Sequence, residues 1–310
     1  MAYEYAPLEK TPHARTRARA RRQRAEDIAV LTPFVDRLLQ TMPPVEQSNP
    51  AQLSHIAFEL FVRQKQDVTR VKSDSIASRH AHRFERFLGE VKNGHSPLTG
   101  ADAIDVLQSC NRFLGLSDPF DDQGLDIGSH FRMSSSFSNK GRMLYNAVKV
   151  LRPSTMLEIG TAYGMSADFL LSAARRFAPD AKLHTIEAGE PQFTLARESL
   201  LDRHGNRVHC YKGLSTDVIP KVIDAAPAVD FVFHDGAHDG QIYQSDFAAL
   251  LPCLQPGAVI VFDDIRWFDK HLTSQDPECY AGWTAITQRP EIALAAEIGT
   301  SVGVAMIGGA

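Results

Sequence analysis

The second half of the chain alternates short apolar runs with amphipathic stretches, and this alternation constrains the fold more than any other feature. The apolar runs are TMLEIG, KLHTIE, RVHCYKG, VDFVFHD and AVIVFDD, followed by IALAAEIG and VGVAMIG. Short apolar runs separated by helical patterns are typical of an open, mostly parallel sheet. The last two runs are separated by only a few residues, which permits a hairpin but no helical crossover. The sequence therefore predicts an α/β fold with a doubly wound, mostly parallel, seven-stranded sheet and a C-terminal antiparallel hairpin.

The residues before about 127 have a different pattern. Apolar residues recur there at helical spacing between prolines and glycines, and no strand pattern is visible. We therefore expect an all-helical N-terminal region, 1–126, that provides lid or dimerisation helices, followed by a second domain, 127–310. A basic tail precedes the helices, with six arginines between Arg15 and Arg24. The tail fits either an RNA-binding arm or a solvated segment, and the lack of aromatic residues within it favours the second.

Composition restricts the class of partner. The chain has 310 residues, 44% of them hydrophobic and 23% charged, with a net charge of -4. These values are typical of a globular protein and argue against a general nucleic-acid or membrane role. No apolar run approaches the roughly 20 residues that span a bilayer. The four cysteines show no metal-binding or disulfide spacing. We expect a cytoplasmic protein with a small-molecule partner.

A glycine-bearing turn follows the first strand of the second domain. Glu158, Gly160 and Gly164 form the pattern E-x-G-x-x-x-G. Gly160 permits a tight turn and close approach of a ligand, and the helix that begins near Gly164 offers N–H groups to an anion, although such turns also occur for packing alone. Glu187 ends the next strand, where an acid can bind both hydroxyls of a ribose. Since the dinucleotide fingerprint G-x-G-x-x-G is absent, a nucleoside without phosphates fits better.

Three aspartates follow two other predicted strands. Asp235 ends one strand, and Asp263 and Asp264 end the next. The carboxyl ends of neighbouring parallel strands meet at one edge of the sheet, so these side chains should converge. Three adjacent carboxylates repel one another unless a cation neutralises them, and Mg²⁺ is the usual ion for such oxygen ligands. The alternative is that the acids cap helices or pair with Arg266 and Lys270.

From about residue 132 to the C-terminus, these motifs resemble those of the class I S-adenosylmethionine-dependent methyltransferases, and especially the metal-dependent small-molecule O-methyltransferases of the catechol O-methyltransferase type. The resemblance implies that the Gly160 region and Ser166 bind the methionine part of S-adenosylmethionine, and that Glu187 binds its ribose. Ser215 and Thr216 would flank the adenine. The full implied cofactor set is Glu158, Gly160, Gly164, Ser166, Glu187, Ser215, Thr216 and Asp235. Metal-dependent members place acids where this chain has Asp235, Asp263 and Asp264.

His238 occupies the position at which the catechol-type enzymes carry a lysine base. Its ordinary pKa, near 6.5, leaves a neutral fraction at pH 7 that can accept a proton from a hydroxyl. Asp239 is a second candidate base, and a metal-binding, substrate-binding or surface role for His238 stays open. The expected activity is Mg²⁺-assisted methyl transfer to a hydroxyl of a small phenolic, polyketide or sugar, by a homodimer. The alternatives are an RNA methyltransferase, a metal-independent methyltransferase and a non-catalytic cofactor-binding protein.

Overall fold

The computed structural model of the chain describes residues 66–74, 79–94, 136–266, 278–299 and 301–308. These residues belong to one compact unit, Arg63–Ser96 with Leu116–Ala310. The arginine tail and most of the predicted N-terminal helices lie outside the described residues, so the predicted lid or dimerisation role of those helices stays a prediction.

The unit is built on an eight-stranded sheet with the order β1-β7-β8-β6-β5-β2-β3-β4. The strands β2 to β6 are parallel to their neighbours within that group, whereas β8 is antiparallel to both β6 and β7. The strands are β1 (Val68–Ser73), β2 (Thr155–Ile159), β3 (Lys182–Glu187), β4 (Val208–Lys212), β5 (Val229–His234), β6 (Leu254–Phe262), β7 (Ile292–Ile298) and β8 (Val302–Ile307). The predicted α/β class and the C-terminal hairpin are confirmed.

The sheet has one strand more than the seven predicted. β1 comes from a stretch that we expected to be helical, and it pairs antiparallel with β7 at the edge of the sheet. Its sequence, VTRVKS, is largely polar and mostly solvent-exposed. An edge strand needs no buried face, and it owes its conformation to its hydrogen bonds with β7. The apolar pattern that identifies the inner strands is therefore missing here.

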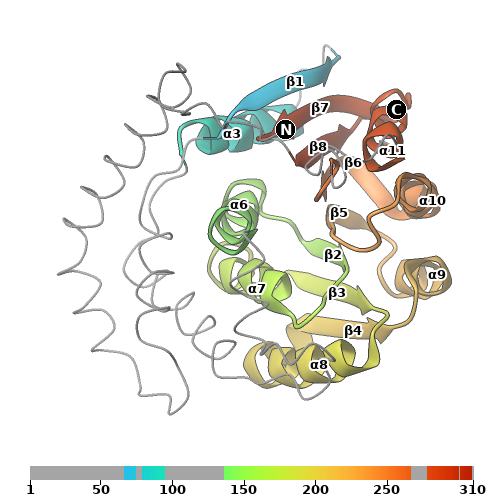
Figure 1. The fold of residues 1–310 in the computed structure, drawn as a ribbon. Helices are drawn as coiled ribbons and strands as arrows, with labels where there is room; N and C mark the ends of the chain where they lie inside the picture. Colours follow the sequence, from blue (N-terminus) through green and yellow to red (C-terminus); the bar gives the residue numbers. More distant parts are fainter. Residues whose placement is uncertain (1–65, 75–78, 95–135, 267–277, 300, 309–310) are drawn as a thin grey trace, which may run out of the picture. The chain divides into compact units, whose positions relative to one another are not determined.

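Helices cover both faces of the sheet (Figure 1). α3, α6, α7 and α8 pack along one face, and α9, α10 and α11 pack along the other. The helices are α3 (Arg79–Lys92), α6 (Ser136–Leu151), α7 (Met165–Phe177), α8 (Glu190–His204), α9 (Ser215–Ala225), α10 (Gly240–Leu250) and α11 (Glu278–Thr287), with 3-10 turns at Gly205–Arg207 and Leu251–Cys253. No helix in the described part of the chain is long and apolar enough to cross a membrane.

The central strands are buried on both faces, as their nearly continuous apolar sequences require. On the α9–α11 face, side chains from these helices pack against the strands in one cluster. Its larger members include Leu157, Val218, Tyr243, Phe247, Ile260, Phe262 and Trp283. This packing supports the sheet beneath the carboxyl ends of its parallel strands.

The register of the parallel strands brings four chain segments to one edge of the sheet. Ile159 of β2 pairs with Ile186 of β3 and with His234 of β5, and His234 pairs with Phe262 of β6. The residues that immediately follow these four are therefore neighbours at the carboxyl edge. They are Gly160, Glu187, Asp235 and Asp263.

Candidate active site

A cavity of about 520 Å³ opens at this carboxyl edge. Its walls come from the ends of β2, β3 and β5 and from α6, α7, α9 and α10. The lining residues include most of the predicted cofactor set, namely Gly160, Ser166, Glu187, Ser215, Thr216 and Asp235, together with Lys140, Thr161, Met165, Phe169, Leu214 and Ile242. A cavity of this size with mainly apolar walls and a few polar groups suits a small organic ligand.

The turn after β2 has a backbone that only certain residues tolerate. Gly160 has a φ of +91°, and a Cβ atom there would lie 2.2 Å from the carbonyl oxygen of Asp235. Gly164 has a φ of +88° and precedes the first residue of α7. Ala162 also has a positive φ, +44°, where a glycine would be less strained. Gly160 therefore serves the close approach of two strand ends, in addition to any approach of a ligand.

Glu187 is held in place by the backbone. Its Oε2 accepts a hydrogen bond from the Ala162 N–H at 2.7 Å, and its Oε1 accepts one from the Gly189 N–H at 2.7 Å. A carboxylate offers about four lone pairs, so each oxygen can still accept a second hydrogen bond. The two backbone donors orient the group, and both oxygens stay able to bind ligand hydroxyls.

Glu158 lies deeper than the other residues of the predicted cofactor set. Its neighbours in β2, Leu157 and Ile159, belong to the α9–α11 face, so Glu158 points to the opposite face. The side chain is fully buried and accepts a hydrogen bond from the Thr185 hydroxyl at 2.5 Å. The Thr185 hydroxyl also contacts that of Thr161, which lines the cavity. Glu158 is thus linked to the cavity through two threonines.

Burial changes the protonation of Glu158. It raises the pKa of this carboxyl to about 7, although hydrogen bonds from the Ser166 and Thr185 hydroxyls act to lower it. A carboxyl with this pKa is partly protonated at neutral pH.

Asp235, Asp264 and His238 lie together beside the cavity. The His238 Nε2 atom is 3.5 Å from Asp235 Oδ1 and 3.8 Å from Asp264 Oδ2. One ligand atom from each of the three residues can be chosen so that all lie within 4.8 Å of one another. Asp264 has a φ of +50°, a strained backbone for a residue with a side chain. These three groups could hold a metal ion.

Asp263 has a different partner from the one predicted. Its side chain is only 1% exposed and forms an ion pair with Lys140 of α6. The Lys140 Nζ atom also lies 3.5 Å from Asp235 Oδ2. Arg266, one of the alternative partners, forms an ion pair with Glu297 at 2.9 Å. Lys270 lies outside the described residues.

The charges around His238 compete with its burial. Burial lowers the pKa of His238, Asp264 and Asp235 act to raise it, and the net change is downward. Burial likewise raises the pKa of Asp235, and the nearby Lys140 ammonium opposes that rise. A lowered pKa leaves His238 neutral at physiological pH, the state in which it can accept a proton.

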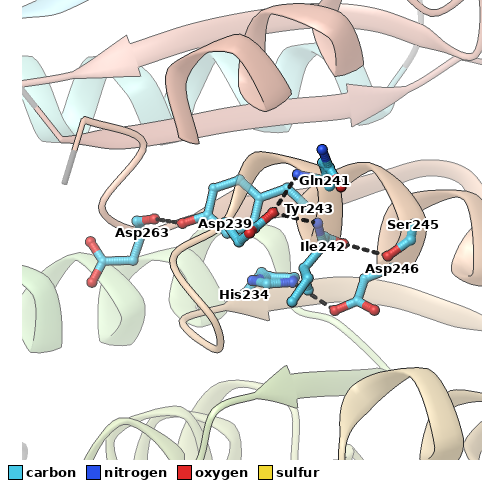
Figure 2. Close-up of polar contacts among 8 residues, drawn as sticks. All are labelled: His234, Asp239, Gln241, Ile242, Tyr243, Ser245, Asp246 and Asp263. Carbon is cyan, nitrogen blue, oxygen red and sulfur yellow. Dashed lines mark hydrogen bonds and ion pairs between the residues drawn. The ribbon is translucent and has the colours of Figure 1, made fainter. Parts of the chain in front are cut away.

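Helix α10 fixes both acidic strand ends (Figure 2). The Tyr243 hydroxyl donates a hydrogen bond to the Asp263 backbone carbonyl at 2.7 Å, and Asp246 lies 3.0 Å from Nε2 of the buried His234. Asp239 caps the helix by accepting the N–H groups of Gln241 and Ile242. One oxygen of Asp239, the second candidate base, is therefore engaged at the helix N-terminus.

Sequence reasoning missed several residues of this site. Lys140 reads as an ordinary charged residue near the start of a helix, and nothing in its neighbourhood in sequence indicates the aspartates. Leu214 is 61% exposed at the cavity wall, and it could have been suspected because it directly precedes Ser215. Tyr243 and Asp246 carry no motif, and their role follows only from the packing of α10 against β5 and β6.

Comparison with known proteins agrees with this geometry. A family model described as a methyltransferase domain matches residues 157–265. The chain is 33% identical over 138 residues to a probable O-methyltransferase of Mycobacterium tuberculosis, covering 41% of this chain and 56% of that protein. It is also 33% identical over 132 residues to catechol O-methyltransferase of Sus scrofa, covering 41% of this chain and 68% of that protein.

A solved structure shares the fold. The S-adenosylhomocysteine-bound methyltransferase PaMTH1 of Podospora anserina is 18% identical, with a TM-score of 0.51, and the likeness covers 76% of this chain and 99% of that one. The chain spans little more than half the length of the mycobacterial relative. From the family match, the identity to the porcine enzyme and the shared fold, the chain belongs to the class I S-adenosylmethionine-dependent methyltransferases, with the O-methyltransferases as its relatives.

Proposed function

We propose that the chain transfers a methyl group from S-adenosylmethionine to a hydroxyl of a small metabolite. The observation that carries this proposal is the position of Asp235, which lines the cofactor-sized cavity and also lies beside His238 and Asp264. A cofactor in the cavity and an acceptor beside the acidic group would therefore be neighbours. Adjacent sites are what a direct transfer between two bound reactants requires.

The cavity residues fit S-adenosylmethionine. Glu187 has an acceptor position left on each oxygen for the two ribose hydroxyls. Leu214, Ser215 and Thr216 provide an apolar side chain and two hydroxyls at the wall where the adenine would lie. Ser166 lies in the first turn of α7, where the N-cap residue Gly164 provides no side-chain cap, and a helix N-terminus favours an anion such as the methionine carboxylate.

The acidic group fits a divalent ion such as Mg²⁺. One oxygen of Asp235, one oxygen of Asp264 and a ring nitrogen of His238 lie within 4.8 Å of one another, which leaves the two carboxylates close enough to hold one ion. Asp235 and Asp264 would hold the ion in this proposal, and the predicted ligand Asp263 would stay with Lys140. A bound divalent ion supplies a Lewis acid that lowers the pKa of a substrate hydroxyl.

The chain's own residues would carry the remaining chemistry. His238, neutral at physiological pH, accepts the hydroxyl proton. The substrate oxygen forms a bond to the methyl carbon while the bond from that carbon to sulfur breaks, which leaves S-adenosylhomocysteine and a methyl ether. Correct alignment of the two reactants can contribute about 7–11 kcal/mol to such a reaction. The substrate is a small hydroxylated compound of the phenolic, polyketide or sugar class.

The test begins with cofactor binding. Calorimetry should detect S-adenosylhomocysteine binding, and Glu187→Ala should weaken it by about 1.5–3 kcal/mol, the value of a hydrogen bond to a charged group. Glu190→Ala is the matched control, because Glu190 is exposed and pairs with Lys212. Transfer of a labelled methyl group to catechol then tests the activity. Absence of cofactor binding by the unaltered protein would overturn the proposal.

A further inference from the structure

The predicted three-aspartate group already contains a cation. Lys140 projects from α6 to the ends of β5 and β6, where its ammonium pairs with Asp263 and lies 3.5 Å from Asp235 Oδ2. The lysine side chain is 15% exposed and that of Asp263 is 1% exposed. The pair is therefore largely shielded from water, and salt would screen it only weakly.

The burial of Asp263 requires such a partner. An ionised carboxylate removed from water is costly unless a positive charge or several hydrogen bonds compensate it. Among the residues that the structure describes, Lys140 is the positively charged side chain paired with Asp263. Lys140 therefore supplies the compensation that we first assigned to a metal ion.

Asp235 is shared between this pair and the candidate metal group. Its Oδ2 is the oxygen near Lys140, whereas its Oδ1 is the oxygen near His238. The two carboxylate oxygens thus face two different partners, the Lys140 ammonium and the His238 imidazole. On the side of Oδ1, Asp264 and His238 complete the group that could bind a metal.

We propose that Lys140 is an internal counter-ion that excludes Asp263 from metal coordination and weakens divalent ion binding at Asp235 and Asp264. Lys140 also lines the cofactor cavity, so one side chain contacts both halves of the site. It is a positioning residue, since it acts through the aspartates. This inference rests on the metal site of the proposed function.

Mn²⁺ titration of the full chain, without cofactor or substrate, tests the inference. Lys140→Met removes a positive charge a few ångströms from the ion and releases Asp263, so we expect Mn²⁺ to bind at least about tenfold more tightly than to the unaltered protein. Lys140→Arg keeps the charge and should bind Mn²⁺ like the unaltered protein. Lys149→Met is the matched control, because Lys149 is on the same helix and lies over the ring of Phe177.

The outcomes separate this inference from the proposed function. Unchanged or weaker Mn²⁺ binding by Lys140→Met, or equal gains in the Met and Arg variants, would overturn it. Lys140→Gln provides a second neutral variant if the first does not fold, and the same gain is expected from it. Calorimetry with S-adenosylhomocysteine on the same samples tests the proposed function independently, because its failure in the unaltered protein leaves the Mn²⁺ comparison intact.

Discussion

The buried carboxyl of Glu158 should make the stability of the fold depend on pH. Its pKa is about 7 in the folded chain, against 4.5 for an ordinary glutamate. Between these values the folded state holds a proton that the unfolded state has lost, so the free energy of unfolding falls as pH rises. The stabilising contribution is present below 4.5 and is lost as pH passes through about 7.

The magnitude follows from the two pKa values. At about 1.4 kcal/mol per pH unit, integration from pH 5 to pH 8 gives a loss of about 2.5 kcal/mol from this one group. Glu158→Gln cannot titrate, so the variant should lack this part of the pH dependence. Other groups titrate equally in both proteins, and they cancel when the two pH dependences are subtracted.

Urea unfolding at pH 5 and pH 8, without cofactor, measures this difference. The free energy of unfolding should fall by about 2.5 kcal/mol more in the unaltered chain than in Glu158→Gln. Glu198→Gln, at an exposed position of α8, is the control and should behave like the unaltered chain. Parallel pH dependences for the Glu158 variant and the unaltered chain would refute the reasoning, because they would mean that the Ser166 and Thr185 hydroxyls keep Glu158 ionised despite its burial.

Three further changes test other parts of the site. Gly160→Ala would place a Cβ 2.2 Å from the carbonyl oxygen of Asp235, so urea unfolding should show a loss of about 2–4 kcal/mol; a loss under about 1 kcal/mol would contradict this close approach. Tyr243→Phe removes the hydrogen bond to Asp263 and should cost about 1–2 kcal/mol of unfolding free energy, whereas an unchanged midpoint would show that the bond has no net value. His238→Ala should lower kcat about 10²- to 10⁴-fold with unchanged S-adenosylhomocysteine affinity. In the unaltered protein, turnover of catechol should stop in EDTA and return when Mg²⁺ is added, and full activity in EDTA would reject the metal.

The inner strands could be predicted because each one is buried. A parallel strand covered on both faces must be apolar along most of its length, and VDFVFHD and AVIVFDD display this directly. β1 could not be found in this way. Its partner β7 is more than 200 residues away in the chain. The side chains of β1 are mostly polar and exposed, so its sequence has no pattern that distinguishes it from other exposed segments.

Some residues of the site could likewise be predicted from the sequence, whereas others depend on the tertiary packing. The ends of β2, β3, β5 and β6 meet because parallel strands share an edge, so Glu187 and Asp235 could be placed in one crevice from strand order alone. How deeply each side chain is buried could not be predicted from the sequence. Glu158 is in a motif associated with ligand binding, yet its side chain ends in the interior, behind the hydroxyls of Thr185 and Thr161. Lys140 acquires its partners only because α6 crosses the ends of two strands that follow it much later in the chain.

Asp235 joins the two halves of the site through both its backbone and its side chain. Its carbonyl oxygen lies 2.2 Å from the position that a Cβ of residue 160 would take, so the glycine turn after β2 packs closely against the acidic end of β5. One carboxylate oxygen is near Lys140 of the cavity wall, and the other is near His238. A cofactor that displaces the Gly160 turn or the Lys140 ammonium would therefore change the electric field at the proposed metal site and at the proposed base, His238. Binding of the methyl donor and preparation of the acceptor should accordingly be coupled energetically through Asp235, whose backbone packs against Gly160 and whose side chain lies beside Lys140 and His238.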